Sequence, residues 1–570
     1  MTEQHHGPTL PIAEETHARK HRLAGESFRE AMSRIANVLA DSPEHFDKYR
    51  DVLLNQRFLP GGRIQAATGS PRKTTAFNCY VSGTIEDSMD GIMDKAKEAA
   101  KTMRLGGGIG YDFSTLRPKG DLIVSLDSKS SGPLSFMAIF DAICTTVSSA
   151  GMRRGAQMGV LRIDHPDIED FIEAKTNSTK YSQFNLSVGV TDAFMEAVDH
   201  DLEFNLHYKG RVYKRVNARY LWDKLMRATW DWAEPGILFI DRINEMNNLS
   251  YCETIAATNP CGEQPLPPYG ACLLGSFNLV KYITEYQPGH YRFNWDLFKE
   301  DIPVVVRAQD NVINNTVFPL VQQEQEAFNK RRMGIGYTGL ANAGEALGYS
   351  YGSPEFLKFQ EKLSKLLANE AYLASSKLAE EKGAFPLFDK EKYLEGKFIQ
   401  RLDKDVQESI QLFGIRNSHL LSIAPTGTIS ITADNVSSGC EPVFSYYYDR
   451  TIITDGGDKK VERISDYGYR VWGIEGKTAA ECTTDEHLAV LITATKWVDS
   501  AVSKTLNVGE NVSWEDFKDI YMKAWKAGCK GATTFRAAGK RYGVLNAIET
   551  PEDVTTACYY DMSTGQKSCS

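Results

Sequence analysis

Two spacings of apolar residues alternate along this chain, one typical of helices and one typical of strands. Residues 18–56 place apolar positions three or four apart among many charges, so residues 1–56 are predicted as a short helical N-terminal region. Beyond it, short runs rich in β-branched and aromatic residues precede amphipathic stretches. SQFNLSVGV, for example, precedes TDAFMEAVDH, and CYVSGTI precedes DSMDGIMDKAKEAAKTMRL. This order is typical of an α/β fold with parallel strands.

The same alternation continues to about residue 545, which predicts one large α/β unit over residues 57–545. An α/β barrel is the closure we expect. Near the end of this unit, HLLSIAPTGTISI and GATTFR have the composition of strands. The last segment, residues 546–570, carries little apolar periodicity and several small polar residues, so we expect a mobile tail there.

Composition and charge exclude several classes of protein. The chain has 570 residues, 42% of them hydrophobic, and its net charge of -9 gives no general attraction to nucleic acid or anionic membranes. The polar N-terminus lacks the apolar core of a signal peptide, and no apolar run reaches about eighteen residues. We therefore expect a cytoplasmic protein without nucleic acid or membrane partners.

The ten cysteines are spread along the chain without a CxxC pair, which fits neither a disulfide scaffold nor a zinc ribbon. No metal site is predicted, so any special cysteine acts as a redox thiol. Cys558 and Cys569 stand in the polar tail, where no core can bury them and where exposed free thiols are normally avoided. A mobile dithiol of this kind can reach a buried disulfide and reduce it by exchange.

NPCGEQPLPPYG, residues 259–270, places a cysteine between an amide and a carboxylate in a stretch rich in glycine and proline. These residues exclude a regular helix and disfavour an internal strand, so a turn or loop presents Cys261. Taken alone, the stretch is equally typical of a structural bend around a buried thiol. Cys79 in FNCYVSG and Cys272 in GACLLGSFNL lie in strand-like runs, and each by itself is more typical of a small core residue.

Two further glycine-containing stretches have two interpretations each. LGGGIGYDFSTLRPKG, residues 105–120, lacks the strand-then-GxGxxG order of a dinucleotide site and forms either a tight turn or a cradle for a ligand. APTGTISITADN, residues 424–435, follows an apolar run and offers amides and hydroxyls that suit phosphate. Its other interpretation is a hydroxyl-rich turn that caps a helix.

Together, and in this order, the segments resemble the catalytic chain of ribonucleotide reductase. The resemblance covers most of residues 57–570 and rests on FNCYVSGTIEDSMDGI, LGGGIGYDFSTLRPKG, NPCGEQPLPPYG with GACLLGSFNL, PTGTIS, SSGCEPVF and GCKGATTFR. It implies a ten-stranded α/β barrel with a central finger loop that carries Cys261 at its tip. The implied activity is the reduction of ribonucleotides to 2′-deoxyribonucleotides by thiyl-radical chemistry.

The resemblance also assigns the catalytic residues. Cys261 becomes a transient thiyl radical that takes hydrogen from the 3′ carbon of the ribose, while Glu263 acts as general base and Asn259 bonds the ribose hydroxyls. Cys79 and Cys272 supply two reducing equivalents and end as a disulfide, and the 2′ hydroxyl leaves as water. The loop is rigid in this interpretation because a misplacement of about an ångström costs on the order of a hundredfold in rate.

Binding residues follow from the same resemblance. An allosteric nucleoside triphosphate is held by Asp87, Ser88 and Arg117, and MRRGAQMG belongs to the loops that link this effector to base choice. Asp87 and Arg117 have a second interpretation as solvated surface charges. Effector loops of this family often pack across a homodimer. The implied substrate-binding residues are Asn78, Gly108, Pro425, Thr426, Gly427, Thr428, Ile429 and Ser430.

The source of the radical divides the family into classes. PLPPYGACLLGS, GCKGATTFR and the ending CYYDMSTGQKSC resemble the class that uses adenosylcobalamin and needs no partner chain. In the alternative class, the chain binds no such cofactor, and a ferritin-like dimetal subunit relays an electron through two adjacent tyrosines. Thr533 and Thr534 stand where that pair usually lies, which disfavours this class. Tyr559 and Tyr560 are either a relocated relay or two aromatic residues of a polar tail.

The tail pair, Cys558 and Cys569, would by the same resemblance pass electrons on from a thioredoxin-like or glutaredoxin-like reductant. The N-terminal region is too short for the nucleotide-binding cone of many family members, so on-off control by ATP and dATP is not expected. The residues alone leave two other functions open. One is a non-catalytic nucleotide-binding barrel with core cysteines, and the other is a thiol oxidoreductase, which would need the missing CxxC pair.

Overall fold

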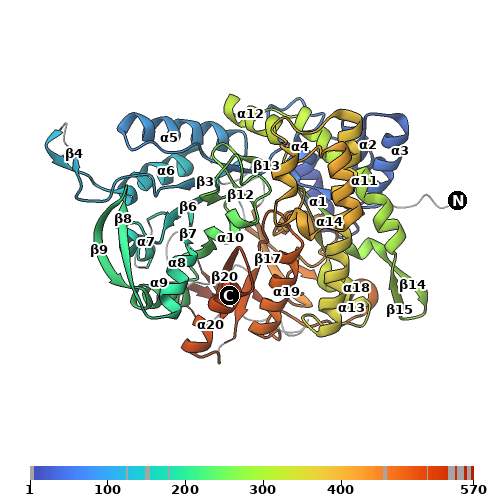
Figure 1. Ribbon diagram of the computed structural model, residues 1–570. Helices are drawn as coiled ribbons and strands as arrows, with labels where there is room; N and C mark the ends of the chain where they lie inside the picture. The colour runs from blue at the N-terminus through green and yellow to red at the C-terminus, as the bar shows by residue number, and fades with distance from the viewer. Residues whose placement is uncertain are drawn as a thin grey trace.

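Helices surround a large mixed sheet in the computed structural model of this chain (Figure 1). The structure describes residues 6–123, 126–147, 155–176, 180–453, 459–509, 511–536, 539, 546–547, 558–560 and 567–569. The sheet has ten strands, which confirms the predicted α/β class. In hydrogen-bonded order these are β1 (Phe58–Pro60), β13 (Ala271–Asn278), β2 (Cys79–Val81), β3 (Gly108–Asp112), β6 (Gln157–Arg162), β7 (Phe184–Val190), β10 (Gly236–Phe239), β20 (Gly531–Arg536) and β19 (Thr505–Val508), with β16 (Met333–Thr338) also on β13.

Apart from the edge strand β1, which runs antiparallel to β13, strand direction divides the sheet into two parallel groups. β2, β3, β6, β7 and β10 run parallel to one another. In the second group, β13 runs parallel to β16, and β19 runs parallel to β20. The two groups meet in antiparallel pairs, β2 with β13 and β10 with β20. Parallel neighbours need long crossover connections, which explains why helices separate the strands along the chain.

Backbone pairing continues beyond β16. Ile335 donates its N–H to the carbonyl of Leu420 at 2.7 Å, and Ile423 donates to the carbonyl of Ala501 at 3.2 Å. Both residues also take part in isolated parallel bridges to the same two segments. The ladder therefore extends from β16 through residues 420–423 to the residues just before β19.

Three helices form the N-terminal region: α1 (Pro11–His21), α2 (Phe28–Leu39) and α3 (Pro43–Leu54). A capping box starts α2, because the Ser27 hydroxyl accepts from the N–H of Glu30 while the Glu30 carboxylate accepts from the N–H of Ser27. The apolar stripe of α2 is buried in the main core. Helix α1 starts earlier than the pattern indicated, since proline is favourable at the first position of a helix.

The longer helices lie around the sheet (Figure 1), and the predicted strand–helix pairs β2–α5 and β7–α8 are confirmed. The longer helices are α5 (Met89–Arg104), α6 (Pro133–Val147), α9 (Ala218–Trp232), α11 (Trp295–Asn314), α14 (Pro354–Lys382), α19 (Thr484–Lys496) and α20 (Trp514–Lys526). The shorter helices are α4 (Gly62–Ala67), α7 (Ile168–Ile172), α8 (Asp192–Asp199), α10 (Ile240–Glu245), α12 (Val321–Lys330), α13 (Leu340–Ala346), α15 (Lys390–Leu394) and α16 (Lys404–Phe413). Three hairpins are β4 (Leu122–Ile123) with β5 (Ser128–Lys129), β8 (Glu203–Tyr208) with β9 (Arg211–Asn217) and β14 (Ile283–Gln287) with β15 (His290–Phe293).

The segment HLLSIAPTGTISI is only partly extended. Its first residues make the backbone pairs described above, whereas α17 (Gly427–Thr432) occupies its second half. Pro425 has no N–H for a ladder, and Thr426 has a left-handed φ of 54°, so the chain turns there and begins a helix. The prediction of a strand over the second half is therefore wrong.

Alternation along the strands separates two apolar layers. Leu273 and Met333 belong to the main core, which includes the buried sides of the surrounding helices. Cys272 and Leu274 belong to a smaller cluster together with Cys79. Successive side chains of a strand point to opposite faces, so this cluster marks the second face of the sheet.

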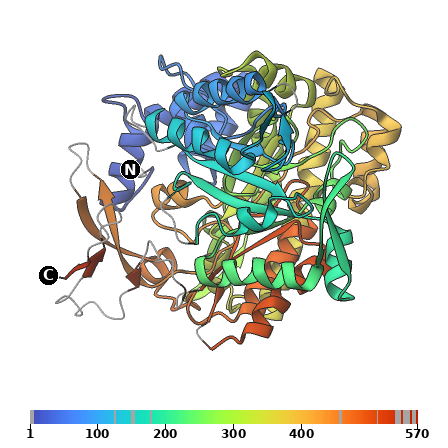
Figure 2. The ribbon, with the colours of Figure 1, turned by 90° about the vertical axis from the view of Figure 1, so that its left-hand side faces the viewer.

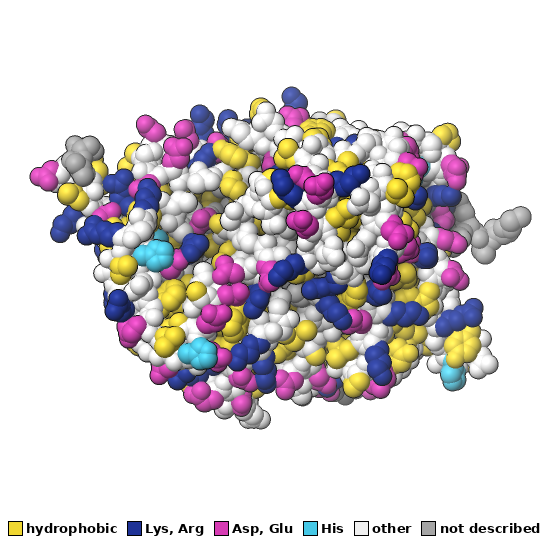
Figure 3. All heavy atoms as spheres, in the orientation of Figure 1, with side chains coloured by type: hydrophobic (Ala, Val, Ile, Leu, Met, Phe, Trp, Pro, Cys, Tyr) yellow, Lys and Arg dark blue, Asp and Glu magenta, His cyan; other side chains and the backbone are white. Residues whose placement is uncertain are grey.

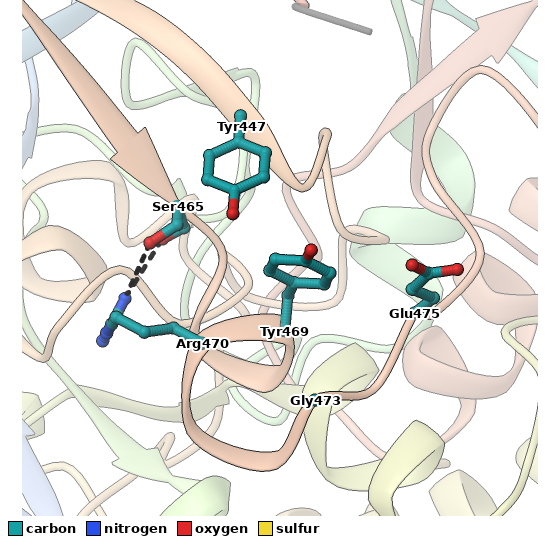
Figure 4. Close-up of a pocket in the computed structure, with 6 residues that line it drawn as sticks. All are labelled: Tyr447, Ser465, Tyr469, Arg470, Gly473 and Glu475. Atoms are coloured by element: carbon teal, nitrogen blue, oxygen red, sulfur yellow. Dashed lines mark hydrogen bonds between the residues drawn. The ribbon is translucent and has the colours of Figure 1, made fainter. Parts of the chain in front are cut away.

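A long hairpin, β17 (Tyr447–Ile453) with β18 (Lys459–Ser465), projects from the body on the left side of Figure 2. The short strand β21 (Asn546–Ala547) pairs with β17. After the hairpin comes α18 (Tyr467–Trp472), and a cavity of about 480 Å³ opens beside both (Figure 4). None of the predicted site residues lines it; its walls are Tyr447, Ser465, Tyr469, Arg470, Gly473 and Glu475.

Near this cavity, the Glu345 side chain of α13 accepts a hydrogen bond from the N–H of Lys477 at 2.8 Å. Burial, and then the nearby Asp466 carboxylate, raises the pKa of Glu345 to about 8. The folded chain thus keeps a proton on Glu345 that the unfolded chain loses above the ordinary pKa of 4.5. Stability conferred by this protonated group is lost as the pH rises towards the folded-state pKa.

Glu345→Gln keeps an acceptor for the Lys477 N–H and removes the titration. As the pH rises from about 5 to about 8, the unchanged protein should lose stability relative to this variant. The difference between their free energies of unfolding should grow by up to about 1.4 kcal/mol per pH unit. Urea unfolding across this range measures the difference, with the exposed Glu475→Gln as control. A difference that does not change with pH would contradict the raised pKa.

Acidic and basic side chains are interspersed over the face shown in Figure 3, in keeping with the modest net charge. Within the described ranges, no helix combines the length and apolar character needed to span a bilayer. Over the same part of the chain, no group of three or more His, Cys, Asp or Glu side chains has an arrangement that could hold a metal ion.

Candidate active site

A small hairpin carries the proline-rich motif. Its strands are β11 (Ala257–Thr258) and β12 (Pro265–Leu266), and its tip is closed by its own hydrogen bonds. Asn259 donates its N–H to the carbonyl of Gln264 at 3.1 Å, and its side-chain oxygen accepts from the N–H of Gln264 at 2.9 Å. Gly262 takes a left-handed φ of 80° that glycine adopts without strain. The predicted loop is thus confirmed, with short strands on either side.

Both strand groups hold this tip. On one side, the Asn185 side chain of β7 donates to the carbonyl of Pro260 at 2.8 Å. On the other, the carbonyl of Glu263 accepts from the Ser422 hydroxyl and from the N–H of Ala501, each at 3.0 Å. The tip is therefore fixed between segments that lie far apart in the sequence.

Glycines of β3 make room for the tip. A Cβ atom on Gly110 would stand 1.8 Å from the carbonyl oxygen of Thr258, and one on Gly108 would stand 3.1 Å from the ring of Pro260. Any side chain at Gly110 would collide with backbone that other contacts hold in place. The sequence left two interpretations for this glycine run, a tight turn or a cradle for a ligand. At Gly110, the missing side chain instead makes room for the backbone of the loop that carries Cys261.

Two cysteines meet directly beneath the tip. Cys272 on β13 pairs with Cys79 on β2, and both are buried. Directly paired residues have Cα atoms about 4.5–5.5 Å apart, within the range that a disulfide spans. The Asn259 side chain donates to the Cys79 sulfur at 3.2 Å, and that sulfur lies 3.8 Å from a Glu263 carboxylate oxygen. The structure thus brings together four of the five predicted catalytic residues by direct contacts.

The fifth, Cys261, stands at the tip with its side chain exposed. The Cys261 thiol is one of the groups that raise the pKa of Cys79. A Cβ on the adjacent Gly262 would meet no atom within 4 Å, so there is open space on that side of Gly262. The interpretation as a bend around a buried thiol is therefore wrong.

Burial raises the pKa of both paired thiols well above its ordinary value. At Cys79 the Glu263 carboxylate raises the pKa further, against the hydrogen bond from Asn259. Both sulfurs therefore stay protonated near neutral pH. Two protonated thiols beside a carboxylate suit the donation of hydrogen and electrons to a bound molecule, whereas a nucleophilic cysteine needs a lowered pKa.

A family model described as "Ribonucleotide reductase, barrel domain" matches residues 77–535, a range that contains the whole cluster. The chain belongs to the ribonucleotide reductase family. It is 34% identical to the vitamin B12-dependent ribonucleoside-diphosphate reductase of Mycobacterium tuberculosis, over 95% of this chain and 78% of that protein.

Two further ribonucleotide reductases are similar to this chain. The vitamin B12-dependent ribonucleoside-diphosphate reductase of Thermoplasma acidophilum is 33% identical over 91% of this chain and 69% of its own length. The vitamin B12-dependent ribonucleotide reductase of Streptomyces clavuligerus is 28% identical over 90% of this chain and 62% of its own length.

The loop predicted to bind the substrate phosphate in this reductase begins at Pro425 and runs into α17. The Thr426 hydroxyl accepts from the N–H of Gly439 at 2.8 Å, and Ser430 is bonded to the Ser438 hydroxyl at 3.0 Å. These hydroxyls therefore hold the turn together. Gly427 is exposed, and Pro425 and Thr428 are half-buried, so these three residues of the loop reach solvent.

The three predicted effector residues lie together at the start of α5. Arg117 Nε contacts Asp87 Oδ2 at 2.8 Å, and the hydroxyl of Tyr208 donates to the same oxygen at 3.2 Å. Ser88 caps α5 by accepting from the N–H of Gly91. Asp87 and Arg117 are ion-paired and only 13% and 30% exposed, so their interpretation as solvated surface charges is wrong.

Several predicted residues lie outside the described residues, among them 152–154 of MRRGAQMG and most of the tail. For the tail pair, the backbone of β22 (Cys558–Tyr560) pairs with that of β23 (Lys567–Cys569), with Cys558 opposite Cys569. The tyrosine pair belongs to β22, and its proposed relay stays a prediction. Sequence reasoning missed Ser422 and Ala501: Ser422 lies within the strand-like run HLLSI, and no pattern in the sequence pointed to Ala501.

Proposed function

We propose that this chain is the catalytic chain of a ribonucleotide reductase that acts on ribonucleoside diphosphates and takes its radical from adenosylcobalamin. One observation carries the proposal: the Cys79–Cys272 pair lies against a hydrogen-bonded loop tip that presents Cys261, Asn259 and Glu263. The names of the relatives reported above support the diphosphate substrate and the cobalamin cofactor.

The proposal includes a closed ten-stranded barrel. Residues 420–423, placed between β16 and β19 by the backbone bonds described above, would complete a ring with β2, β3, β6, β7, β10, β20 and β13. The ring would consist of two parallel halves that meet in antiparallel pairs. A finger loop inside it is supported by the contacts of Pro260 with one half and of Glu263 with the other.

In the proposed reaction, the Cys261 radical takes the hydrogen atom from the 3′ carbon of the ribose. Glu263, 3.8 Å from the Cys79 sulfur, removes the proton of the 3′ hydroxyl, and Asn259 bonds the ribose hydroxyls. The 2′ hydroxyl takes up a proton and leaves as water. Cys79 and Cys272 supply the two electrons and their protons and form a disulfide, since their protonated sulfurs stand together directly beneath the tip. Cys261 then returns the hydrogen atom to the 3′ carbon and is a radical again.

The oxidised pair must then be reduced again. We propose that Cys558 and Cys569 do this by thiol–disulfide exchange and receive electrons from a thioredoxin-like or glutaredoxin-like protein. The pairing of their backbones places them opposite each other, as a dithiol that cycles through a disulfide requires. The phosphate groups of the substrate would meet the first N–H groups of α17, Gly108 would border the ribose, and Asn78 would join the set that binds it.

The exposure of Cys261 fits adenosylcobalamin, because a group that generates a radical on this sulfur must approach it directly. The open space at Gly262 leaves room for such a group, so Cys261 and Gly262 would border it. When bound, adenosylcobalamin supplies the oxidising equivalent that turns the Cys261 thiol into a radical. The chain's own part is to hold that sulfur in place through the hydrogen bonds of Asn259 and Gln264.

This radical source makes a ferritin-like subunit unnecessary, and we propose none. A homodimer is supported by Met89 and Met93 of α5, which expose 61% and 46% of their surface beside the effector residues. We propose that Asp87, Ser88 and Arg117 bind an allosteric nucleoside triphosphate near that contact. The proposed parts of the chain are residues 1–56 as a helical region, 57–545 as the barrel, and 546–570 as the redox tail.

The purified chain, given adenosylcobalamin, dithiothreitol and cytidine diphosphate, is expected to form deoxycytidine diphosphate. Chromatography of the nucleotides measures the product, with cytidine triphosphate in a parallel reaction to test the choice of phosphate chain. Product that appears only after a separate metal-bearing protein is added would move the chain to the other class of reductase. No product under either condition would refute the proposed function.

A further inference from the structure

Three side chains stand in a row across neighbouring strands on the second face of the sheet. Cys272 pairs with Cys79 on one side. On its other side, β13 runs parallel to β16, with Leu273 paired to Met333. Cys272 and Arg332 are the residues just before this pair, so the same register puts them next to each other. Since Leu273 and Met333 point into the main core, Cys272 and Arg332 both project to the opposite face. Arg332 thus flanks Cys272 on the side away from Cys79.

Arg332 is buried, with 3% of its side chain exposed, and carboxylates fix its charge. Its guanidinium donates to Glu326 at 3.0 Å and also to Glu253, which lies 2.8 Å from the ammonium of Lys330. Burial works to lower the pKa of Arg332, but these carboxylates raise it overall, so the side chain stays charged. A buried ion pair of this kind keeps a fixed geometry.

Among the groups that act on the Cys272 thiol, Arg332 is the cation. Burial raises the pKa of the Cys272 thiol, the Arg332 cation opposes this, and Asp499 and Glu263 add to it. Burial raises the pKa of Asp499 itself.

The two sulfurs therefore differ in what faces them. Cys79 lies 3.8 Å from the Glu263 carboxylate, which disfavours a negative charge on that sulfur. Cys272 lies beside the Arg332 cation, which favours a negative charge on the Cys272 sulfur. In thiol–disulfide exchange the attacking thiolate bonds to one sulfur and the other leaves as a thiolate, and a leaving sulfur whose anion is stabilised departs faster.

We propose that Arg332 is a positioning residue for re-reduction, which makes Cys272 the leaving sulfur and Cys79 the sulfur that is attacked. The inference rests on the proposed function in one respect, the formation of a Cys79–Cys272 disulfide. An incoming thiolate bonds to the Cys79 sulfur while the Cys79–Cys272 bond breaks, and Cys272 leaves as a thiolate that takes up a proton. A second thiol of the same reductant then displaces Cys79 and becomes oxidised with the first.

The test follows the pre-formed disulfide directly, without nucleotide or adenosylcobalamin. The full chain is oxidised, dithiothreitol is added, and the rate at which Cys79 and Cys272 become open to alkylation is measured by mass spectrometry. Arg332→Gln is expected to slow this rate about tenfold, and Arg332→Lys, which keeps the charge, to stay within about threefold of the unchanged chain. Arg331→Gln is the matched control, because Arg331 is an equally buried neighbour that pairs with Asp310 instead.

The equilibrium potential of the pair separates this role from a structural one. Both thiols are protonated once reduced, so the potential measured in dithiothreitol buffers should be the same for Arg332→Gln and the unchanged chain. If Arg332→Gln fails to fold, the double variant Arg332→Gln, Glu253→Gln is used in its place, because it removes both partners of the buried ion pair and leaves neither charge unpaired by the other. An unchanged rate in the charge-free variants would overturn the proposal.

The identity of the attacked sulfur gives a second readout. A monothiol such as glutathione, followed by rapid alkylation, should trap a mixed disulfide on Cys79. A mixed disulfide on Cys272 would overturn the inference while leaving the proposed function intact. If no Cys79–Cys272 disulfide forms at all under oxidising conditions, the redox role of the pair, and with it the proposed function, fails.

Discussion

Cys261→Ser is expected to lower deoxyribonucleotide formation by at least about a thousandfold, since it removes the group that acts covalently in the first step. A serine hydroxyl has nearly the size of the thiol but does not yield its hydrogen atom to a radical generator. The fold should be preserved, because Cys261 is exposed at the tip and the bonds that close the tip come from its neighbours.

Product formation with cytidine diphosphate measures this effect. Cys252→Ser is the matched control, because Cys252 is also an exposed cysteine but is not one of the predicted site residues. Its activity should stay within about twofold of the unchanged chain, as for most surface substitutions. Substantial turnover in Cys261→Ser would refute a thiyl radical at Cys261. The chain would still belong to the family, but the proposed mechanism would be wrong.

Gly110→Ala is the second substitution with a large expected effect. The added Cβ would lie 1.8 Å from the carbonyl oxygen of Thr258, so backbone at the base of the finger loop must move. Overpacking of this kind costs about 1–3 kcal/mol of stability. A shift of about an ångström at the tip is expected to reduce kcat on the order of a hundredfold, because Cys261 would no longer be aimed at the ribose.

The control for this variant is Gly189→Ala on β7. Gly189 also lies within a central parallel strand, but a Cβ there would meet its nearest atom at 3.6 Å, an ordinary contact. Thermal unfolding and kcat are to be compared for both variants. Equal activity in the two would mean that the loop tolerates displacement, and that its rigidity is unimportant for the reaction.

The local structure of the site was readable in the sequence. The prolines and glycines of NPCGEQPLPPYG fix a loop, and the apolar runs around Cys79 and Cys272 fix strands, because these preferences act over a few residues. HLLSIAPTGTISI shows the limit of such preferences. Its β-branched residues favour a strand throughout, yet the turn at Pro425 and Thr426 starts a helix that buries them.

Other features of the site depend on contacts between distant segments. The Ser422 and Ala501 bonds to Glu263, the room that Gly110 leaves for Thr258, and the row that ends in Arg332 each join strands separated by more than fifty residues. No local pattern encodes such distances, since strand order and register are set only when the sheet assembles.

The sequence by itself determined the α/β class, the motif loop and the strands that carry the two inner cysteines, because composition and short-range spacing suffice for these. Its motifs, taken together and in order, also carried the resemblance to the family. Only the tertiary structure decided that Cys261 is exposed while Cys79 and Cys272 are buried side by side, and that opposite charges face those two sulfurs. Burial and electrostatic environment are properties of the assembled sheet, and they come from residues that the chain brings together only on folding.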